Sequence, residues 1–198
     1  AMMLSATSCN CKEESPLKAK VEEYAPVELS SELVSGLTDN EKEIVKIFFE
    51  IGQIADDLFW KQTFGDKSLL DGIEDPYAKQ FAYMQYGAWD RLDDNRPFLE
   101  GYQAKPAACH YYPQDITAEE FEALQDPNKD SWYTVLRRDE NGNLIVKWYH
   151  EEYAEEVGKM CELLQKAADL AEDPGLKNYL LKRIDAFRTD EYLASDLA

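Results

Sequence analysis

The sequence predicts a mainly α-helical domain that carries one β-hairpin. Apolar residues recur at helical spacing from Thr38 to about Gln62, and again in two stretches after residue 150. Between these stretches, two runs of aromatic and β-branched residues flank Asn141-Gly142, a dipeptide typical of hairpin turns. With 198 residues, of which 44% are hydrophobic, the chain is long enough for one domain with its own core plus a small appendage.

The first predicted helices begin at recognisable capping residues. Thr38-Asp39-Asn40-Glu41 is a capping box, because the threonine hydroxyl and the glutamate carboxylate each accept a hydrogen bond from an otherwise unpaired amide. A short helix is expected over 67–72, and another begins at Asp75 with Pro76 in its first turn. The apolar stripe of the long helix comprises Ile44, Ile47, Phe48, Ile51, Ile54, Ala55, Leu58 and Phe59.

Residues 86–113 follow neither a helical nor a strand period. An irregular segment of this length in a compact domain indicates a functional or closely packed loop. A second capping box begins a short helix at Thr117. Because Asn141 and Gly142 both tolerate positive φ, the strands of the hairpin are expected over 131–136 and 143–149.

The C-terminal part is predicted to be helical. One helix is expected from His150 to Ala171, a second begins at Asp173, and a further helical turn begins at Thr189. The sequence stops at Ala198 inside an apolar helical pattern with no terminating glycine, proline or polar tail. We therefore expect the folded domain to span 37–198 and to be truncated at its end.

Composition excludes several classes of function. A formal net charge of -19 disfavours binding to nucleic acid or to an anionic membrane surface, since both would be repelled. No window holds the roughly 18 consecutive apolar residues of a transmembrane helix. The four cysteines, Cys9, Cys11, Cys109 and Cys161, lack the paired spacing of a structural zinc site.

The N-terminal segment has two interpretations. The small residues before Cys9 are typical of the end of a bacterial lipoprotein signal, with Cys9 as the acylated residue. The protein would then be exported and lipid-anchored to an envelope membrane, periplasmic or surface, with residues 1–36 as a signal remnant and disordered tether. The alternative is an arbitrary N-terminus without an anchor. Neither interpretation assigns catalysis to this segment.

The residues by themselves assemble no active site. His150-Glu151-Glu152 begins like a zinc-peptidase helix, but position 154 is alanine and position 155 is glutamate, so the second histidine is missing. His110 adjoins Cys109, yet neighbours on an extended chain point to opposite faces, which favours a structural or substrate-contacting role. We therefore predict no catalytic residue and no metal ligand in this chain.

Several longer strings carry a family resemblance. They include 54–62, 64–67, Tyr86-Gly87-Ala88-Trp89-Asp90-Arg91-Leu92, 112–117, 136–139 and 171–176. In this order they resemble the N-terminal part of bacterial zinc hydrolases related to dipeptidyl peptidase III. The resemblance covers roughly Leu37 to Ala198.

The resemblance implies the N-terminal part of a larger, two-lobed metallopeptidase that removes dipeptides from the N-terminus of short peptides. The family binds zinc through a His-Glu-x-x-Gly-His helix and a second glutamate-bearing helix, neither of which occurs in this sequence. This portion would therefore bind no cofactor, with short peptides and the missing C-terminal region as partners. The rival hypothesis is a lipid-anchored, non-catalytic binding or scaffold domain.

Two irregular segments, 86–92 and 105–117, are the predicted contributors to a substrate cleft or to the contact with the missing region. The alternative is that they form a tightly packed aromatic connection within this portion. The predicted cleft residues are Tyr86, Trp89, Asp90, Arg91, His110 and Tyr112.

Overall fold

The computed structural model describes residues 14–198. Cys9, the predicted lipidation site, lies outside the described residues. The chain divides into two compact units, a smaller one with described residues 14–27 and 68–104 and a larger one with 28–67 and 105–198. The sequence predicts one domain over 37–198. The expectation is corrected because 68–104 forms a separate core with the N-terminal segment.

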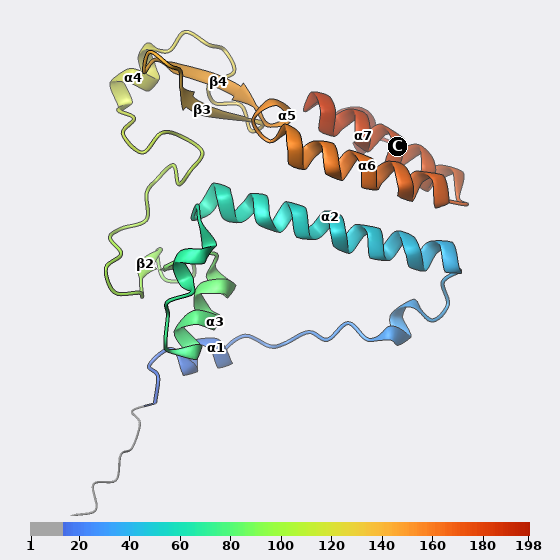
Figure 1. The fold of residues 1–198 in the computed structure, drawn as a ribbon, viewed down its shortest axis with the longest axis horizontal. Helices are drawn as coiled ribbons and strands as arrows, with labels where there is room; N and C mark the ends of the chain where they lie inside the picture. Colours follow the sequence, from blue (N-terminus) through green and yellow to red (C-terminus); the bar gives the residue numbers. More distant parts are fainter. Residues whose placement is uncertain (1–13) are drawn as a thin grey trace, which may run out of the picture. The chain divides into compact units, whose positions relative to one another are not determined.

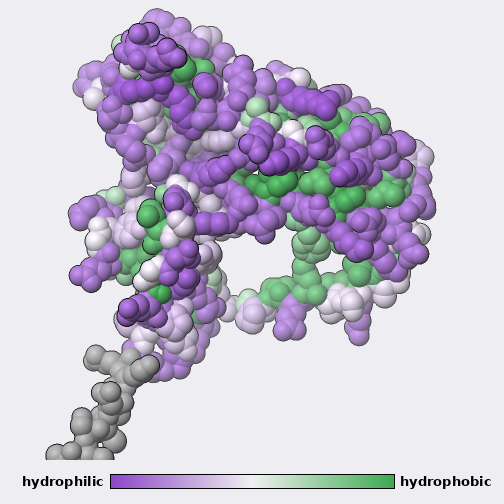
Figure 2. All heavy atoms as spheres, in the orientation of Figure 1, coloured by the Kyte–Doolittle hydropathy of each residue, from purple (hydrophilic) through white to green (hydrophobic). Residues whose placement is uncertain are grey.

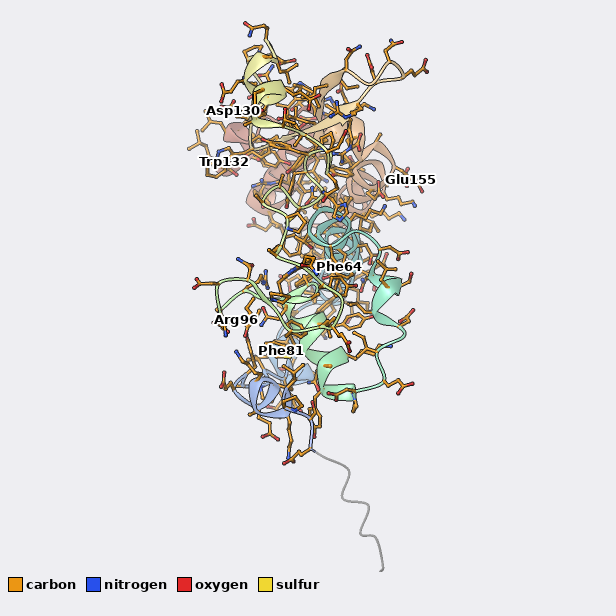
Figure 3. All side chains as sticks on the ribbon, turned by 90° about the vertical axis from the view of Figure 1, so that its left-hand side faces the viewer. Phe64, Phe81, Arg96, Asp130, Trp132 and Glu155 are labelled. Carbon is orange, nitrogen blue, oxygen red and sulfur yellow. The ribbon has the colours of Figure 1, made fainter. Side chains whose placement is uncertain are left out.

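The smaller unit is built around one buried aromatic residue. Phe81 is 1% exposed, and its ring centroid lies 4.7 Å from that of Phe98 and 6.4 Å from that of Tyr24. Figure 1 shows the unit's two helices close together, and Figure 3 labels Phe81 on the second of them. The elements are α1 (Lys18–Glu22), α3 (Pro76–Gln85) and two short antiparallel strands, β1 (Trp89–Asp90) and β2 (Arg96–Pro97).

The segment predicted to be a solvated tether contributes to this unit. Val21 on α1 is buried, and Ser15 donates a hydrogen bond to the Asp75 carboxylate that also caps α3. Lys20 forms an ion pair with the buried Asp90. The tether prediction is therefore wrong for residues 14–24, because this segment supplies the opposite charge and the apolar contact that the rest of the unit needs.

The larger unit is a helical bundle with a hairpin. As predicted, α2 begins with a capping box in which the Thr38 hydroxyl accepts from the Glu41 amide and the Glu41 carboxylate accepts from the Thr38 amide. None of the helices in the described residues is both long and apolar enough to cross a membrane. The elements are η1 (Ser31–Val34), α2 (Asp39–Thr63), η2 (Lys67–Leu70, at the border of the two units), α4 (Ala118–Ala123), β3 (Thr134–Arg138), β4 (Leu144–Trp148), α5 (Tyr149–Glu152), α6 (Ala154–Leu170), α7 (Pro174–Thr189) and α8 (Leu193–Asp196).

The core of the larger unit lies where α2, α6 and α7 meet. Helix α6 packs against both neighbours, and Figure 1 shows α6 and α7 side by side. Figure 2 shows apolar side chains running along this bundle. The buried cluster comprises Ile44, Ile47, Val135, Tyr153, Val157, Met160, Cys161, Leu164, Ala167, Ala168, Leu180 and Ile184.

The hairpin turn differs in detail from the prediction. Only Gly142 has positive φ, at 84°, whereas Asn141 does not. The Asp139 amide donates to the Asn143 carbonyl at 2.9 Å, and the Gly142 amide donates to the Asp139 carbonyl at 3.0 Å. The loop therefore has three residues and ends in a left-handed glycine, the next most common way to close a hairpin.

The helix expected from His150 to Ala171 is interrupted. Tyr153 has φ -111° and ψ 36°, which separates α5 from α6. Its side chain is buried in the core cluster, with its ring centroid 5.6 Å from that of Tyr149. The break in the helix falls at the residue whose ring joins the core cluster of α2, α6 and α7.

The last predicted helical turn also begins later than expected. Helix α7 includes Thr189 and ends at Asp190, whose φ is 59°. The buried Asp190 carboxylate lies 2.7 Å from the His150 Nδ1 atom. This long-range contact stabilises a left-handed residue that the local sequence does not predict. Helix α8 then begins at Leu193.

Candidate functional site

Two of the predicted cleft residues lie at the surface of the smaller unit. Tyr86 ends α3 in a left-handed conformation with φ 54°. The guanidinium carbon of Arg91 lies 5.6 Å from the centroid of the Tyr86 ring, within cation–π range. The exposed Arg91 is thus partly oriented by the turn that terminates α3.

The other two residues of this segment are buried and hydrogen-bonded within the unit. Trp89 donates through Nε1 to the Gln103 carbonyl at 2.8 Å. Asp90 is 4% exposed, pairs with Lys20, and accepts a hydrogen bond from the Leu92 amide at 3.0 Å. These contacts support the alternative that 86–92 forms a packed connection, while the role of the four residues in a cleft stays a prediction.

In the larger unit, His110 attaches the 105–117 segment to the end of α2. Its backbone amide donates to the Gln62 carbonyl at 2.9 Å, and its Nε2 atom lies 2.9 Å from the Phe64 carbonyl oxygen. A carbonyl only accepts hydrogen bonds, so Nε2 carries the proton in this contact. Gly65 makes the approach possible, since a Cβ atom there would lie 3.0 Å from Nε2.

The same segment then follows the outer edge of β3. The Leu136 amide donates to the Tyr111 carbonyl at 3.1 Å. Arg137 donates through one guanidinium nitrogen to the carbonyls of Tyr111 and His110, and through Nε to the Glu152 carboxylate. The guanidinium therefore ties the irregular segment to both β3 and α5, a role that sequence reasoning did not find because all partners are distant in sequence.

A polar hollow of about 480 Å³ lies on one side of this segment. Arg137 and Glu152, which form an ion pair, both line it. The hollow therefore offers hydrogen-bond donors and acceptors side by side. Lys61 adds a second cation to the wall and forms an ion pair with Glu156. The principal lining residues are Lys61, His110, Tyr112, Gln114, Arg137 and Glu152.

An aromatic groove of about 600 Å³ lies on the other side, so Tyr112 lines both hollows. The rings of Tyr112 and Phe121 are stacked with centroids 5.7 Å apart. Burial raises the pKa of the phenols of Tyr111, Tyr112 and Tyr149, so these hydroxyls stay neutral at physiological pH. The groove-lining residues that the argument uses are Tyr111, Tyr112, Phe121, Trp132, Tyr149 and the acidic Asp130.

The hairpin has a free edge. The Tyr149 amide donates to the Tyr133 carbonyl at 2.8 Å, which makes this a hydrogen-bonded pair of the antiparallel ladder. Since such pairs alternate, the amides and carbonyls of Leu144 and Val146 point away from β3. The sheet has two strands, so within the described residues no further strand covers this edge of β4.

The described residues do not fit a zinc centre. Among residues 14–198 there is no group of three or more histidine, cysteine, aspartate or glutamate side chains arranged to hold a metal ion. Both histidines are engaged, His110 with the Phe64 carbonyl and His150 with the Asp190 carboxylate. The geometry offers instead a strand edge, a charged hollow and an aromatic groove, all suited to holding a polypeptide.

Comparison with solved structures tests the resemblance to dipeptidyl peptidase III. Dipeptidyl peptidase III from Caldithrix abyssi matches 91% of this chain with a TM-score of 0.79 and 31% sequence identity. The enzyme from Corallococcus sp. strain EGB matches 91% with a TM-score of 0.81 and 30% identity. This chain resembles the N-terminal region of bacterial dipeptidyl peptidase III. It spans 36% of the length of each of these dipeptidyl peptidase III chains.

Sequence comparison adds a partial match. Over 121 residues, 48% of this chain, it is 30% identical to Nudix hydrolase 3 from Arabidopsis thaliana, of which the match covers 16%. The chain itself lacks the run of glutamates after a glycine that is typical of a Nudix motif. No family model matches the chain. The similarity to dipeptidyl peptidase III therefore rests on fold and sequence together over nearly the whole described chain.

Proposed function

We propose that this chain is the N-terminal portion of a zinc-dependent dipeptidyl peptidase that releases dipeptides from the N-terminus of short peptides. The observation that carries the proposal is the match of 91% of the chain to two dipeptidyl peptidase III structures at about 30% identity. In this proposal the portion binds and orients the peptide, and the zinc centre lies in the remainder of the enzyme.

Zinc in such an enzyme lowers the pKa of a bound water and polarises the peptide carbonyl. We assign no catalytic step to the described residues of this chain. Their part is to hold the substrate. The free edge of β4 presents the amides and carbonyls of Leu144 and Val146, to which an extended peptide can add as a further strand.

Assay of the complete natural protein tests the proposal. A short peptide with a free N-terminus is incubated with the protein, and released dipeptides are detected by mass spectrometry. We expect dipeptide release that stops after treatment with a chelator and returns with zinc, and no release by the 198-residue chain alone. The same peptide with an acetylated N-terminus is the matched control. A complete protein that releases no dipeptide, or releases it unchanged after zinc removal, would overturn the proposal.

The strand-addition step has its own test. An extended peptide on a strand edge pairs through every second residue, so N-methylation of one alternate set of amides should weaken binding while methylation of the other set should not. Binding of the two methylated peptides is compared by isothermal titration calorimetry. Equal affinities would show that the peptide is not held along the edge of β4.

We also propose that the protein is exported and anchored by a lipid on Cys9. The support is the run of small residues before Cys9 in the sequence. The natural protein and its Cys9→Ser variant are separated into membrane and soluble fractions. The anchor predicts that only the variant is soluble, and equal fractionation would refute it.

A further inference from the structure

The aromatic groove of the larger unit combines an apolar floor with an acidic rim. Tyr112 and Phe121 are stacked inside it, and Trp132 beside them is 88% exposed. Figure 3 labels Trp132 and Asp130 on the same side of the unit as α4. The exposed indole and the adjoining apolar hollow form a continuous apolar surface in contact with water. A ligand that covers this surface would remove it from water.

Two carboxylates at the rim are free to receive a cation. Asp130 and Glu122 both line the groove and are exposed, and within residues 14–198 no ion pair forms to either of them. The pKa of the Tyr112 phenol is raised mainly by burial and, to a smaller extent, by the negative charge of Asp130. The Asp130 carboxylate is therefore close enough to act on the stacked rings. A cationic group in the groove would therefore meet both a negative charge and an aromatic face.

One ammonium group of the chain already lies against a ring of this groove. The Nζ atom of Lys129 lies 4.7 Å from the centroid of the Phe121 ring and donates to the Phe121 carbonyl at 2.8 Å. Lys129 is thus engaged with α4, and its ammonium lies within cation–π range of the Phe121 ring. The Asp130 carboxylate and the Trp132 indole are not used by this contact.

We infer that the aromatic groove is a binding site for a peptide segment in which a lysine or arginine lies next to an apolar side chain. The apolar side chain covers the floor beside Trp132, and the cation lies at Asp130 and Glu122. Charge complementarity commits the proposal to this occupant, since the net charge of -19 attracts cationic peptides and repels acidic ones. The inference rests on the proposed peptide-binding function and names the class of peptide that the region selects.

Three blocked peptides test the site on the 198-residue chain. They are acetyl-Leu-Arg-Leu-Arg-amide, acetyl-Leu-Gln-Leu-Gln-amide, which lacks the charge, and acetyl-Gly-Arg-Gly-Arg-amide, which lacks the apolar side chains. Binding is followed by the tryptophan fluorescence of the chain. We expect the first peptide to bind about tenfold more tightly than either of the others, with an affinity that falls as salt is added.

Variants locate the site. Glu122→Gln with Asp130→Asn should reduce the affinity for the first peptide about tenfold and leave the affinity for the uncharged peptide unchanged. The matched control, Glu50→Gln with Glu162→Gln, removes the same charge from exposed positions on α2 and α6 and should leave both affinities unchanged. Trp132→Ala should weaken binding of both leucine-containing peptides. Circular dichroism of each variant confirms that its helices are intact.

The inference is overturned if the three peptides bind equally, or if the control pair reduces affinity as much as the groove pair. The first result would mean non-specific association and the second would mean attraction by net charge alone. Because the probes have blocked N-termini and the readout is binding, failure of the groove is distinguishable from failure of the proposed dipeptide release, which is measured on free N-termini.

Discussion

Substitution of Gly65 by alanine tests how the 105–117 segment is held to α2. Gly65 has φ 97°, which costs an L-residue about 1–2 kcal/mol. The added Cβ atom would also lie 3.0 Å from His110 Nε2 and 3.1 Å from Cε1. Displacing the ring loses its hydrogen bond to the Phe64 carbonyl, worth about 1 kcal/mol. The free energy of unfolding should therefore fall by about 2–3 kcal/mol.

Gly142→Ala is the matched control. Gly142 also has positive φ, 84°, but nothing lies within 4 Å of an added Cβ atom, so only the conformational cost of about 1–2 kcal/mol applies. Urea unfolding followed by circular dichroism measures both variants, and each is repeated in the His110→Ala background. The excess cost of Gly65→Ala should disappear when the imidazole is absent. Equal costs at both glycines, or an excess that persists without the imidazole, would refute the reasoning.

Two further predictions concern stability. Leu180→Ala should lower the free energy of unfolding by about 2–5 kcal/mol, because Leu180 is fully buried. Leu181→Ala on the same helix should lower it by less than about 1 kcal/mol, because Leu181 is exposed. Comparable losses in urea unfolding would contradict the assigned core. Hydrogen bonds from Arg138 hold the pKa values of Asp115 and Glu120 below their ordinary range. The stability that these bonds contribute to the folded state is therefore present at neutral pH and is lost as pH falls through the lowered pKa values. Arg138→Met should therefore make the urea midpoint less dependent on pH in the acidic range, and an unchanged pH profile would count against this contact.

Features that depend on neighbouring residues were predictable. Thr38 and Thr117 both form the capping boxes that their sequences indicate, and Pro76 lies in the first turn of α3 as expected. Each of these contacts spans three or four residues, so the local sequence contains both partners. The mainly helical fold, the hairpin at Gly142 and the resemblance to dipeptidyl peptidase III are confirmed, because they rest on local periodicity and contiguous strings. The second antiparallel pair, β1 with β2, is not predicted by the sequence.

The candidate site was only partly predictable. His110 and Tyr112 were selected from their place in an irregular aromatic segment, and the structure places them along one wall of the polar hollow. Arg137 and Glu152 were missed because their significance depends on each other and on the carbonyls of 110–111, which are distant in sequence. Trp132 was assigned to a strand by its composition, and nothing in its neighbours indicates that it is exposed beside a groove.

The amino-acid order alone thus accounts for the helices, their first turns and the location of the hairpin. Three features depend on contacts made after the chain folds back: the division into two units, the break at Tyr153 and the left-handed end of α7 at Asp190. In each case a partner at long sequence separation outweighs the local preference of the backbone, because burial of a ring or pairing of a buried carboxylate stabilises the fold more than an unbroken helix would.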